Sequence, residues 1–275
     1  MAIVGARQVG KTTLARELGK RAAPPAYLDL ENPEHEARLA DPVLALKPLR
    51  PAPSGGEASF QTFLERDLPQ LGVNISAPTL RRFWTMLAHY HGQVWNAPDF
   101  GRSFGVSDTT VRRYLDTLAA AMVVRQLLPW FENVAKRQVK SPKIYIADSG
   151  ILHTLLGLSD LPDVEGHPKL GASWDGYVID QLTRRLGARA DECFFWATHA
   201  GAELDFLVVR GRRRFGFEVK RTSRPQLTPS MRSAMADLRL DRLDVLHAGE
   251  ETFMLDRHAR AVAMNRLLID IAPLS

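Results

Sequence analysis

Residues 5–12 carry the first arrangement of residue types that could do chemistry. They read Gly-x-x-x-x-Gly-Lys-Thr and lie between a short apolar run and a segment predicted to be helical from about residue 11 to residue 22. The two glycines permit a tight turn whose backbone N–H groups point at a phosphate chain. The lysine supplies positive charge, and the threonine hydroxyl can join the coordination shell of Mg²⁺. The sequence therefore predicts a phosphate loop that binds ATP and Mg²⁺ through Gly5, Gln8, Val9, Gly10, Lys11, Thr12 and Thr13.

A second arrangement lies on two strands predicted over residues 203–209 and 214–221, which a hairpin joins. Glu218 and Lys220 share one face of the second strand, because side chains two residues apart point the same way. If Asp205 lies across from them, two carboxylates and a lysine converge. Carboxylate oxygens suit Mg²⁺, and a lysine can orient water or stabilise a developing phosphorane.

This pattern predicts an Asp…Glu-x-Lys nuclease site with Asp205, Glu218 and Lys220 as catalytic residues. Asp175 could add a metal ligand from a helix predicted at about residues 171–186. The alternative is that Glu-x-Lys is a solvated ion pair on an exposed strand. The expected metal ligands of the whole chain are Thr12, Asp175, Asp205 and Glu218.

Residues 78–147 show a third pattern, which is typical of a winged helix-turn-helix. Helices are predicted at 78–91, from Asn96 to about Phe104 and at 108–121, and two strands connected by a basic loop follow. The third helix would face a major groove. The expected DNA contacts are Thr109, Thr110, Arg112 and Arg113 on this helix and the wing residues Lys136 and Arg137, accompanied by Lys140 and Lys143. The alternative is a winged helix that packs between domains.

These patterns divide the chain into four segments of an α/β protein. Residues 1–46 are predicted to form a partial P-loop α/β unit, and the Pro- and Gly-rich residues 47–58 form a linker. Residues 59–147 form the helical, winged-helix domain. Residues 148–275 form a nuclease-like domain with a mixed sheet, completed by a helix at about 229–239 and by short strands such as residues 243–247.

Composition narrows the class of protein. The 275 residues are 45% hydrophobic and 24% charged, with a formal net charge of +5, which is ordinary for a globular protein and permits a nucleic-acid partner. The single cysteine, Cys193, excludes an intrachain disulfide framework and is expected to be a buried apolar residue. No apolar run is long enough for a membrane span, and no signal peptide is recognised. These features predict a cytoplasmic protein without a membrane partner.

The motifs together resemble a known family. The chain is similar to the AAA-type ATP-binding proteins of bacteria and archaea, which pair an N-terminal P-loop domain with a C-terminal domain of uncharacterised function. Two segments resemble that family's opening, residues 5–12 and 27–33. Five segments resemble its C-terminal half: residues 60–72, 143–150, 171–182, 196–209 and 215–222. The resemblance implies a restriction-endonuclease-like fold for that half, in which Asp175 stands where the family usually has Glu.

The resemblance also implies that part of the ATPase core is missing. In such proteins a large block with the acidic strand that positions Mg²⁺ and water follows the second strand, and only residues 42–58 stand in its place here. A segment before Met1 is also expected to be missing. We therefore expect an ATP-binding protein with impaired hydrolysis, whose C-terminal modules bind duplex DNA, a protein partner or a second copy. The alternatives are a non-catalytic DNA- or protein-binding remnant and a Mg²⁺-dependent nuclease.

Overall fold

The computed structural model describes residues 75–131 and 139–274. The chain divides into two compact units, Met1–Ser59 and Phe60–Ser275, and all described residues belong to the second. The predicted phosphate loop, the linker and the wing residues Lys136 and Arg137 lie outside the described residues.

Three helices open the described part, as the sequence predicts: α6 (Ala77–His89), α7 (Ala97–Phe104) and α8 (Asp108–Ala120). Serine caps fix the starts of the first and third. The Ser107 hydroxyl accepts a hydrogen bond from the backbone N–H of Thr110 at 3.3 Å, and Ser76 caps α6 in the same way. Gly105 ends α7 with a left-handed φ of 66°, which creates the tight turn before α8.

An aromatic cluster holds these helices together. The fully buried ring of Phe83 makes edge-to-face contacts with four other aromatic rings, a geometry that the ring quadrupole favours. Those rings belong to Trp95, Phe100, Phe104 and Tyr114. On α8, the side chains predicted to face the core are buried: Val111, Leu115 and Leu118.

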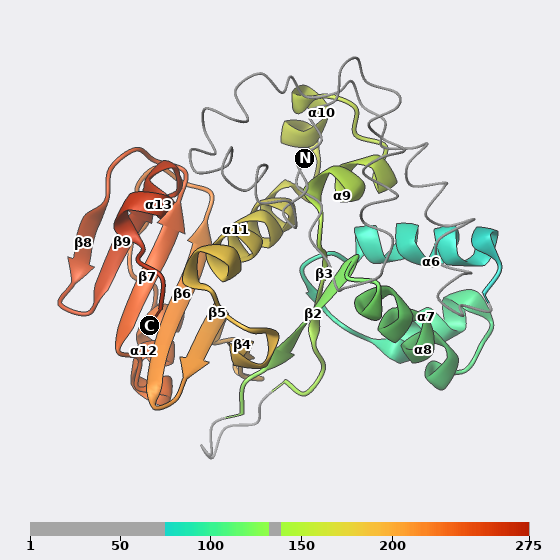
Figure 1. Cartoon of the computed structure of the whole chain (residues 1–275), viewed down its shortest axis with the longest axis horizontal. Helices are drawn as coiled ribbons and strands as arrows, with labels where there is room; N and C mark the ends of the chain where they lie inside the picture. Colours follow the sequence, from blue (N-terminus) through green and yellow to red (C-terminus); the bar gives the residue numbers. More distant parts are fainter. Residues whose placement is uncertain (1–74, 132–138, 275) are drawn as a thin grey trace, which may run out of the picture. The chain divides into compact units, whose positions relative to one another are not determined.

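Within the described ranges, nine strands form one mixed sheet in the order β1-β3-β2-β4-β5-β6-β7-β9-β8. Figure 1 shows the strands of its C-terminal portion side by side. The strands are β1 (Gln93–Val94), β2 (Val124–Pro129), β3 (Lys143–Ile146), β4 (Cys193–Ala197), β5 (Glu203–Arg210), β6 (Arg213–Lys220), β7 (Arg242–His247), β8 (Phe253–Asp256) and β9 (Ala259–Ala263).

The two strands predicted as a wing do pair antiparallel with each other, β2 with β3. However, β2 also pairs in parallel with β4 through Leu128 and Pro129. The ribbon is therefore part of the large sheet, and strand pairing continues across the domain boundary predicted at residue 147.

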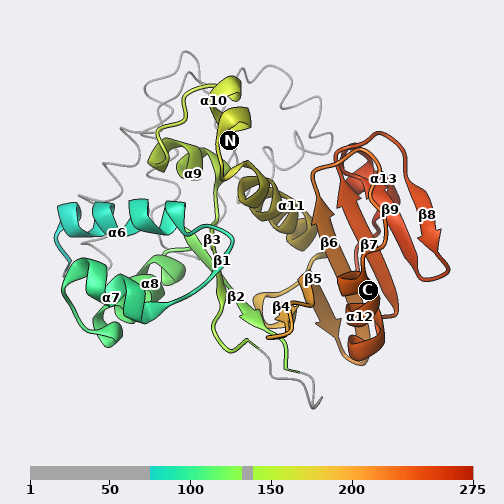
Figure 2. The same cartoon turned by 180° about the vertical axis from the view of Figure 1, so that it is seen from behind.

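Helices cover both faces of the C-terminal strands. The long helix α11 (Leu170–Leu186) packs on the face that carries Phe206 and Phe217, and α12 (Pro229–Leu238) packs on the face that carries Leu204 and Leu207. Figure 2 shows the same helices from behind. Three shorter helices complete the described chain: α9 (Ser149–Leu155), α10 (Leu161–Gly166) and α13 (Leu267–Asp270).

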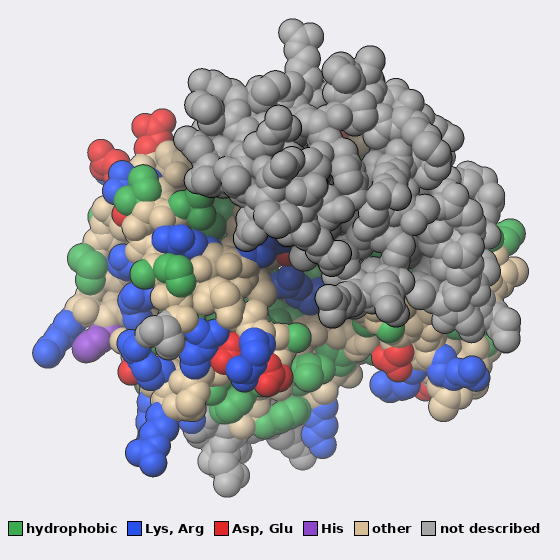
Figure 3. Space-filling view, viewed as in Figure 1, with side chains coloured by type: hydrophobic (Ala, Val, Ile, Leu, Met, Phe, Trp, Pro, Cys, Tyr) green, Lys and Arg blue, Asp and Glu red, His purple; other side chains and the backbone are tan. Residues whose placement is uncertain are grey.

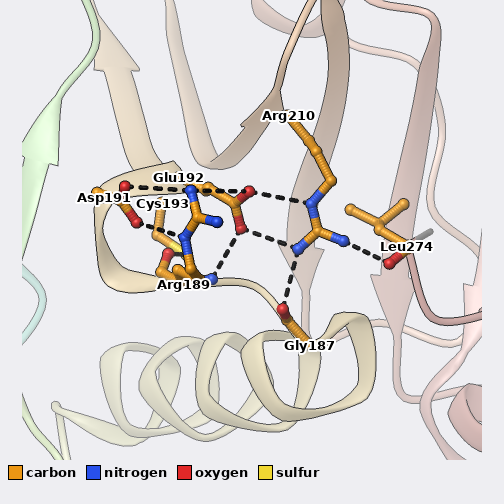
Figure 4. A network of polar contacts seen from close by, with 7 residues as sticks. All are labelled: Gly187, Arg189, Asp191, Glu192, Cys193, Arg210 and Leu274. Atoms are coloured by element: carbon orange, nitrogen blue, oxygen red, sulfur yellow. Dashed lines mark hydrogen bonds and ion pairs between the residues drawn. The ribbon is translucent and has the colours of Figure 1, made fainter.

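A polar network fixes the far end of α11 to the sheet and to the C-terminal tail (Figure 4). The guanidinium of Arg210 donates to both carboxylate oxygens of Glu192 at 3.0 and 2.8 Å, to the carbonyl of Gly187 at 2.9 Å and to the carbonyl of Leu274. This hydrogen bonding with Arg210, and with the backbone N–H of Arg189, lowers the pKa of Glu192 to about 2. The Arg210 guanidinium thus joins the end of the helix, the hairpin and the C-terminal tail.

Two further features agree with the composition. Cys193 is a buried free thiol whose pKa burial raises to about 11, as expected of an inert apolar residue. Across the ranges that the structure describes, no helix is both long and apolar enough to span a bilayer.

Candidate functional site

Asp205 on β5 and Glu218 on β6 lie opposite each other on adjacent antiparallel strands, next to the paired residues Phe206 and Phe217. Each carboxylate accepts a hydrogen bond from the opposite backbone. The N–H of Val219 donates to Asp205 Oδ2 at 3.0 Å, and the N–H of Asp205 donates to Glu218 Oε2 at 3.4 Å. Both side chains are buried. The structure brings these two predicted site residues together.

Lys220 completes the predicted trio. Its Nζ lies 2.8 Å from Glu218 Oε1, and the lysine side chain is 40% exposed while the glutamate side chain is 4% exposed. The pair is therefore not a solvated surface ion pair, because its acidic member is inside the protein. Burial lowers the pKa of Lys220, but the nearby carboxylates of Glu218, Asp205 and Asp175 outweigh burial and raise it.

A second lysine, Lys143, lies in the site, contrary to its predicted position on a wing. Lys143 was expected on an exposed wing, but it is buried at the start of β3, between β1 and β2. Its Nζ lies 3.5 Å from Glu203 Oε2 and 3.8 Å from Asp205 Oδ1. The apolar run Ile144-Tyr145-Ile146 was the available signal, because it marks a buried strand on which a lysine needs a carboxylate partner.

Glu203 was also missed as a site residue. It lies two residues before Asp205 on β5, so the alternation of a strand directs both side chains the same way. The site thus combines four carboxylates, Asp175, Glu203, Asp205 and Glu218, with two lysines, Lys143 and Lys220. Its formal charge has a surplus of two negative charges.

The carboxylates respond to this crowding. Burial, followed by the charge of Asp205, raises the pKa of Asp175 to about 7, and the same two causes raise the pKa of Glu218 to about 7. Burial also raises the pKa of Asp205, against the opposing effect of Lys143. Simultaneous ionisation of these crowded carboxyl groups is costly. A cation bound among them would therefore be stabilised.

The helix that carries Asp175 is held to β3 by a histidine. His91 is buried, and its Nδ1 accepts a hydrogen bond from the N–H of Ile146 at 2.9 Å. The proton is therefore on Nε2, which donates to the carbonyl of Ala172 on α11 at 3.1 Å. Burial lowers the pKa of His91 to about 4, so the ring is neutral. Both ring nitrogens therefore have hydrogen-bond partners.

The donor chemistry fits a hard divalent cation. Asp205 and Glu218 offer carboxylate oxygens side by side, and Mg²⁺ is commonly held by one or two carboxylates while it keeps several waters. Within residues 75–131 and 139–274, no group of three His, Cys, Asp or Glu side chains is arranged to hold a metal ion. Asp175 affects the site through its charge, which contributes to the raised pKa of Lys220.

Of the residues predicted to contact DNA, Thr109, Thr110, Arg112 and Arg113 are described and lie on α8. Thr109, Arg112 and Arg113 are exposed. Thr110 is half-buried, and its hydroxyl contacts the capping Ser107 at 2.9 Å, so it belongs to the helix cap. Figure 3 shows Lys and Arg side chains gathered over the C-terminal strands. Among residues 203–263, the exposed arginines are Arg212, Arg213, Arg221, Arg224, Arg232, Arg239 and Arg257.

Asp148 lies between β3 and α9. Its Oδ1 accepts a hydrogen bond from the N–H of Ile151 at 2.9 Å, and it caps α9. Its role in the structure is that of a helix cap.

The fold and the site define a mixed α/β protein with a helical segment followed by a sheet that carries a buried carboxylate–lysine cluster. Two family models match these parts: a domain of unknown function (DUF8612) matches residues 56–161, and a second domain of unknown function (DUF4143) matches residues 170–267.

Two relatives are similar over almost the whole chain. They are the uncharacterized proteins Rv2008c of Mycobacterium tuberculosis and Mb2031c of Mycobacterium bovis, each 39% identical over 356 aligned positions that include 97% of this chain and 80% of the relative. The chain belongs to the family of these mycobacterial proteins. The alignment has 356 positions and this chain has 275 residues, so at least 356 − 275 = 81 aligned positions have no counterpart in this chain. No solved structure matches.

Proposed function

We propose that this chain is a cytoplasmic ATP-binding protein of the AAA-type P-loop family. The observation that carries the proposal is the Gly-x-x-x-x-Gly-Lys-Thr sequence of residues 5–12 between an apolar run and a predicted helix. Lys11 would contact the phosphates, and Thr12 would hold Mg²⁺. The C-terminal modules would engage DNA or a protein partner.

In this proposal ATP hydrolysis is impaired, because only residues 42–58 stand where the family has the acidic strand of the ATPase core. The aligned positions that lack a counterpart in this chain support an internal shortening. Calorimetric titration of ATP–Mg²⁺ into the full chain tests the binding. We expect saturable binding by the wild type and no binding by Lys11→Ala. Absence of binding by the wild type would exclude this function.

A second candidate function is supported by the geometry of the carboxylate–lysine cluster. We propose that Asp205, Glu218 and Lys220 form a site for metal-dependent cleavage of nucleic-acid phosphodiesters. The supporting observation is the pair of buried carboxylates on adjacent strands with the Lys220 ammonium 2.8 Å from Glu218. When bound, a divalent cation would polarise a phosphoryl oxygen and lower the pKa of a bound water.

The residues of the chain have distinct parts in this second candidate. Asp205 and Glu218 would hold the cation through their oxygens, with Asp205 fixed by the N–H of Val219 at 3.0 Å. Lys220 is half-exposed, so its ammonium can reach both Glu218 and a phosphate that approaches from solvent. The exposed arginines of the C-terminal part would attract the polyanionic backbone.

Plasmid nicking in the presence of Mg²⁺ or Mn²⁺ tests this candidate. We expect cleavage by the wild type, loss of cleavage in Glu218→Gln, and full cleavage in the control Glu250→Gln, which removes an exposed carboxylate outside the site. Cleavage that survives Glu218→Gln would rule out the site. If neither ATP binding nor cleavage is found, the remaining function is that of a non-catalytic DNA- or protein-binding remnant.

The helical part is proposed to form a winged helix-turn-helix that binds duplex DNA. The support is the capped helix α8 after the tight turn at Gly105, with exposed Thr109, Arg112 and Arg113. Because the ribbon β2–β3 belongs to the large sheet, the alternative of a packing role stays open.

A further inference from the structure

Lys143 is a buried cation inside the candidate cleavage site, although it comes from a different part of the chain. It lies on β3, within the segment matched by the first family model, whereas Glu203, Asp205 and Glu218 lie in the segment matched by the second. A lysine is rarely buried without a partner, because removal of the ammonium from water is costly. The site therefore receives one of its charges from outside the domain that carries its carboxylates.

The position of the ammonium is fixed rather than adaptable. The backbone of Lys143 is paired on both sides, with Val94 of β1 and Leu127 of β2. Its Nζ lies 5.2 Å from the centre of the Phe195 ring, within the range of a cation–π contact. Only 9% of the side chain is exposed. The sheet and the surrounding side chains therefore set the position of the Lys143 ammonium. An exposed lysine, by contrast, would have to be ordered from many rotamers.

If two divalent cations occupied this site, the second would share Glu203 and Asp205 and would lie close to this ammonium. The Nζ lies within 4 Å of two carboxylates, 3.5 Å from Glu203 and 3.8 Å from Asp205, while Glu218 on the other side of Asp205 pairs with Lys220. In sites with two divalent cations, the ions share carboxylates and stand close together. An ammonium held between Glu203 and Asp205 would repel a second ion. It would also form ion pairs with the carboxylate oxygens that the second ion would otherwise bind.

We propose that Lys143 is a built-in counter-ion that occupies the second cation position and limits this site to one divalent cation. The inference rests on the second proposed function, the metal-dependent cleavage site. Lys143 acts as a specificity-determining residue for metal occupancy. It also makes the site dependent on the strand β3 that the helical segment supplies.

Titration of Mn²⁺ alone into the full chain, followed by electron paramagnetic resonance of the free ion, tests the inference. We expect one Mn²⁺ per wild-type chain, and binding at least tenfold tighter or a second bound ion in Lys143→Met, since a neighbouring charge within about 4–6 Å shifts such equilibria by about tenfold or more. Methionine keeps the apolar stem of the lysine. Lys140→Met, which removes an exposed lysine from the same loop, should bind as the wild type does.

The outcomes separate this inference from the cleavage function. Equal binding by wild type and Lys143→Met overturns the inference and leaves the cleavage site intact. Binding by Lys143→Met alone excludes a metal-dependent wild-type enzyme and overturns the limit of one cation, because the wild type then binds none. Absence of binding in both overturns both proposals.

A substitution of Glu203, an ion-pair partner of Lys143, provides a test if Lys143→Met does not fold. Glu203→Gln alters a side chain that is 53% exposed and leaves Lys143 with Asp205 as its carboxylate partner. Mn²⁺ affinity is then expected to fall at least threefold, because the ammonium competes fully for Asp205. Unchanged or tighter binding in Glu203→Gln contradicts the role given to Lys143.

Discussion

The imidazole ring of His91 lies directly against Gly176, where an added Cβ atom would come within 2.5 Å of the ring Nε2. This close approach lets Nε2 donate to Ala172 on the same helix while Nδ1 accepts from Ile146 on β3. The helix that carries Asp175 is thereby set against the strand that carries Lys143. The contact positions two charged residues of the candidate site without entering it.

Gly176→Ala is expected to destabilise the protein by about 1–3 kcal/mol, because the new methyl group must displace a buried ring in a packed core. The matched control is Gly171→Ala on the same helix, where an added Cβ meets nothing within 4 Å. It should leave stability unchanged or slightly higher. Urea unfolding of the two variants measures the difference, and equal stabilities would contradict the close packing.

His91 is expected to make stability depend on pH between about 4 and 6.5. Its folded pKa of about 4 lies below the usual 6.5, so the unfolded chain binds the proton first as the pH falls. The neutral ring therefore contributes stability that is complete above pH 6.5 and is lost as the pH falls toward 4. The stability difference between wild type and His91→Gln should shrink over that window in urea titrations. A difference that stays constant would show that His91 does not titrate in this way.

Asp175 should act in the opposite direction. Its folded pKa of about 7 lies above the unfolded value of 3.8, so the folded state retains the proton and loses stability as the pH rises through 7. Asp175→Asn should match the wild type near pH 4 and exceed its stability at pH 8 by about 2 kcal/mol. This figure is roughly half of what about 1.4 kcal/mol per pKa unit implies, since the side chain keeps some contact with water.

A control on the same helix distinguishes this effect from a general response to loss of a carboxylate. Asp180 pairs with Arg125 at 3.0 Å and with Arg184 at 2.8 Å. Asp180→Asn should therefore lower stability at pH 8, while Asp175→Asn raises it. If both substitutions change stability in the same direction, the charge crowding assigned to Asp175 is wrong.

The network around Arg210 connects the end of α11, the hairpin and the C-terminal tail (Figure 4), and its contribution to stability is expected to be lost at acid pH. The folded pKa of Glu192, about 2, lies below the ordinary value of 4.5, so its contribution to stability is present above about pH 4.5 and is lost as the pH falls toward 2. Glu192→Gln should lower the midpoint of thermal unfolding at pH 7 by several degrees. The difference from wild type should fade near pH 2, and a difference that persists there would argue against this ionisation.

Duplex DNA binding by α8 predicts a salt-sensitive loss of affinity on substitution of its exposed arginine. Arg113→Ala should weaken gel retardation about tenfold and reduce the slope of affinity against salt, because a cationic contact is lost. The control Arg257→Ala removes an exposed arginine from a turn between the C-terminal strands. Equal losses in both variants would indicate diffuse electrostatic attraction rather than a reading helix.

Local patterns predicted much of the described fold. The bounds of α6, α8 and α11 follow from helical spacing and caps, and the position of Asp205 across from Glu218 follows from the period of the strands and the short hairpin at Gly211. These features depend on residues that are close in sequence, where geometry leaves few alternatives.

Long-range pairings could not be predicted in the same way. The parallel contact of β2 with β4 involves Leu128 and Pro129 alone on the first strand, and nothing nearby in the sequence specifies it. For that reason Lys143 was assigned to an exposed wing rather than to the carboxylate cluster. The structure corrects this by the position of β3 inside the sheet.

Binding of ATP–Mg²⁺ to the full chain is the most direct test of the central proposal. Calorimetry should show saturable binding by the wild type and by Lys20→Ala, a lysine outside the phosphate loop, and no binding by Lys11→Ala. Hydrolysis measured on the same samples should be at background level. Absence of binding by the wild type, or binding that is the same in Lys11→Ala, would contradict the proposal.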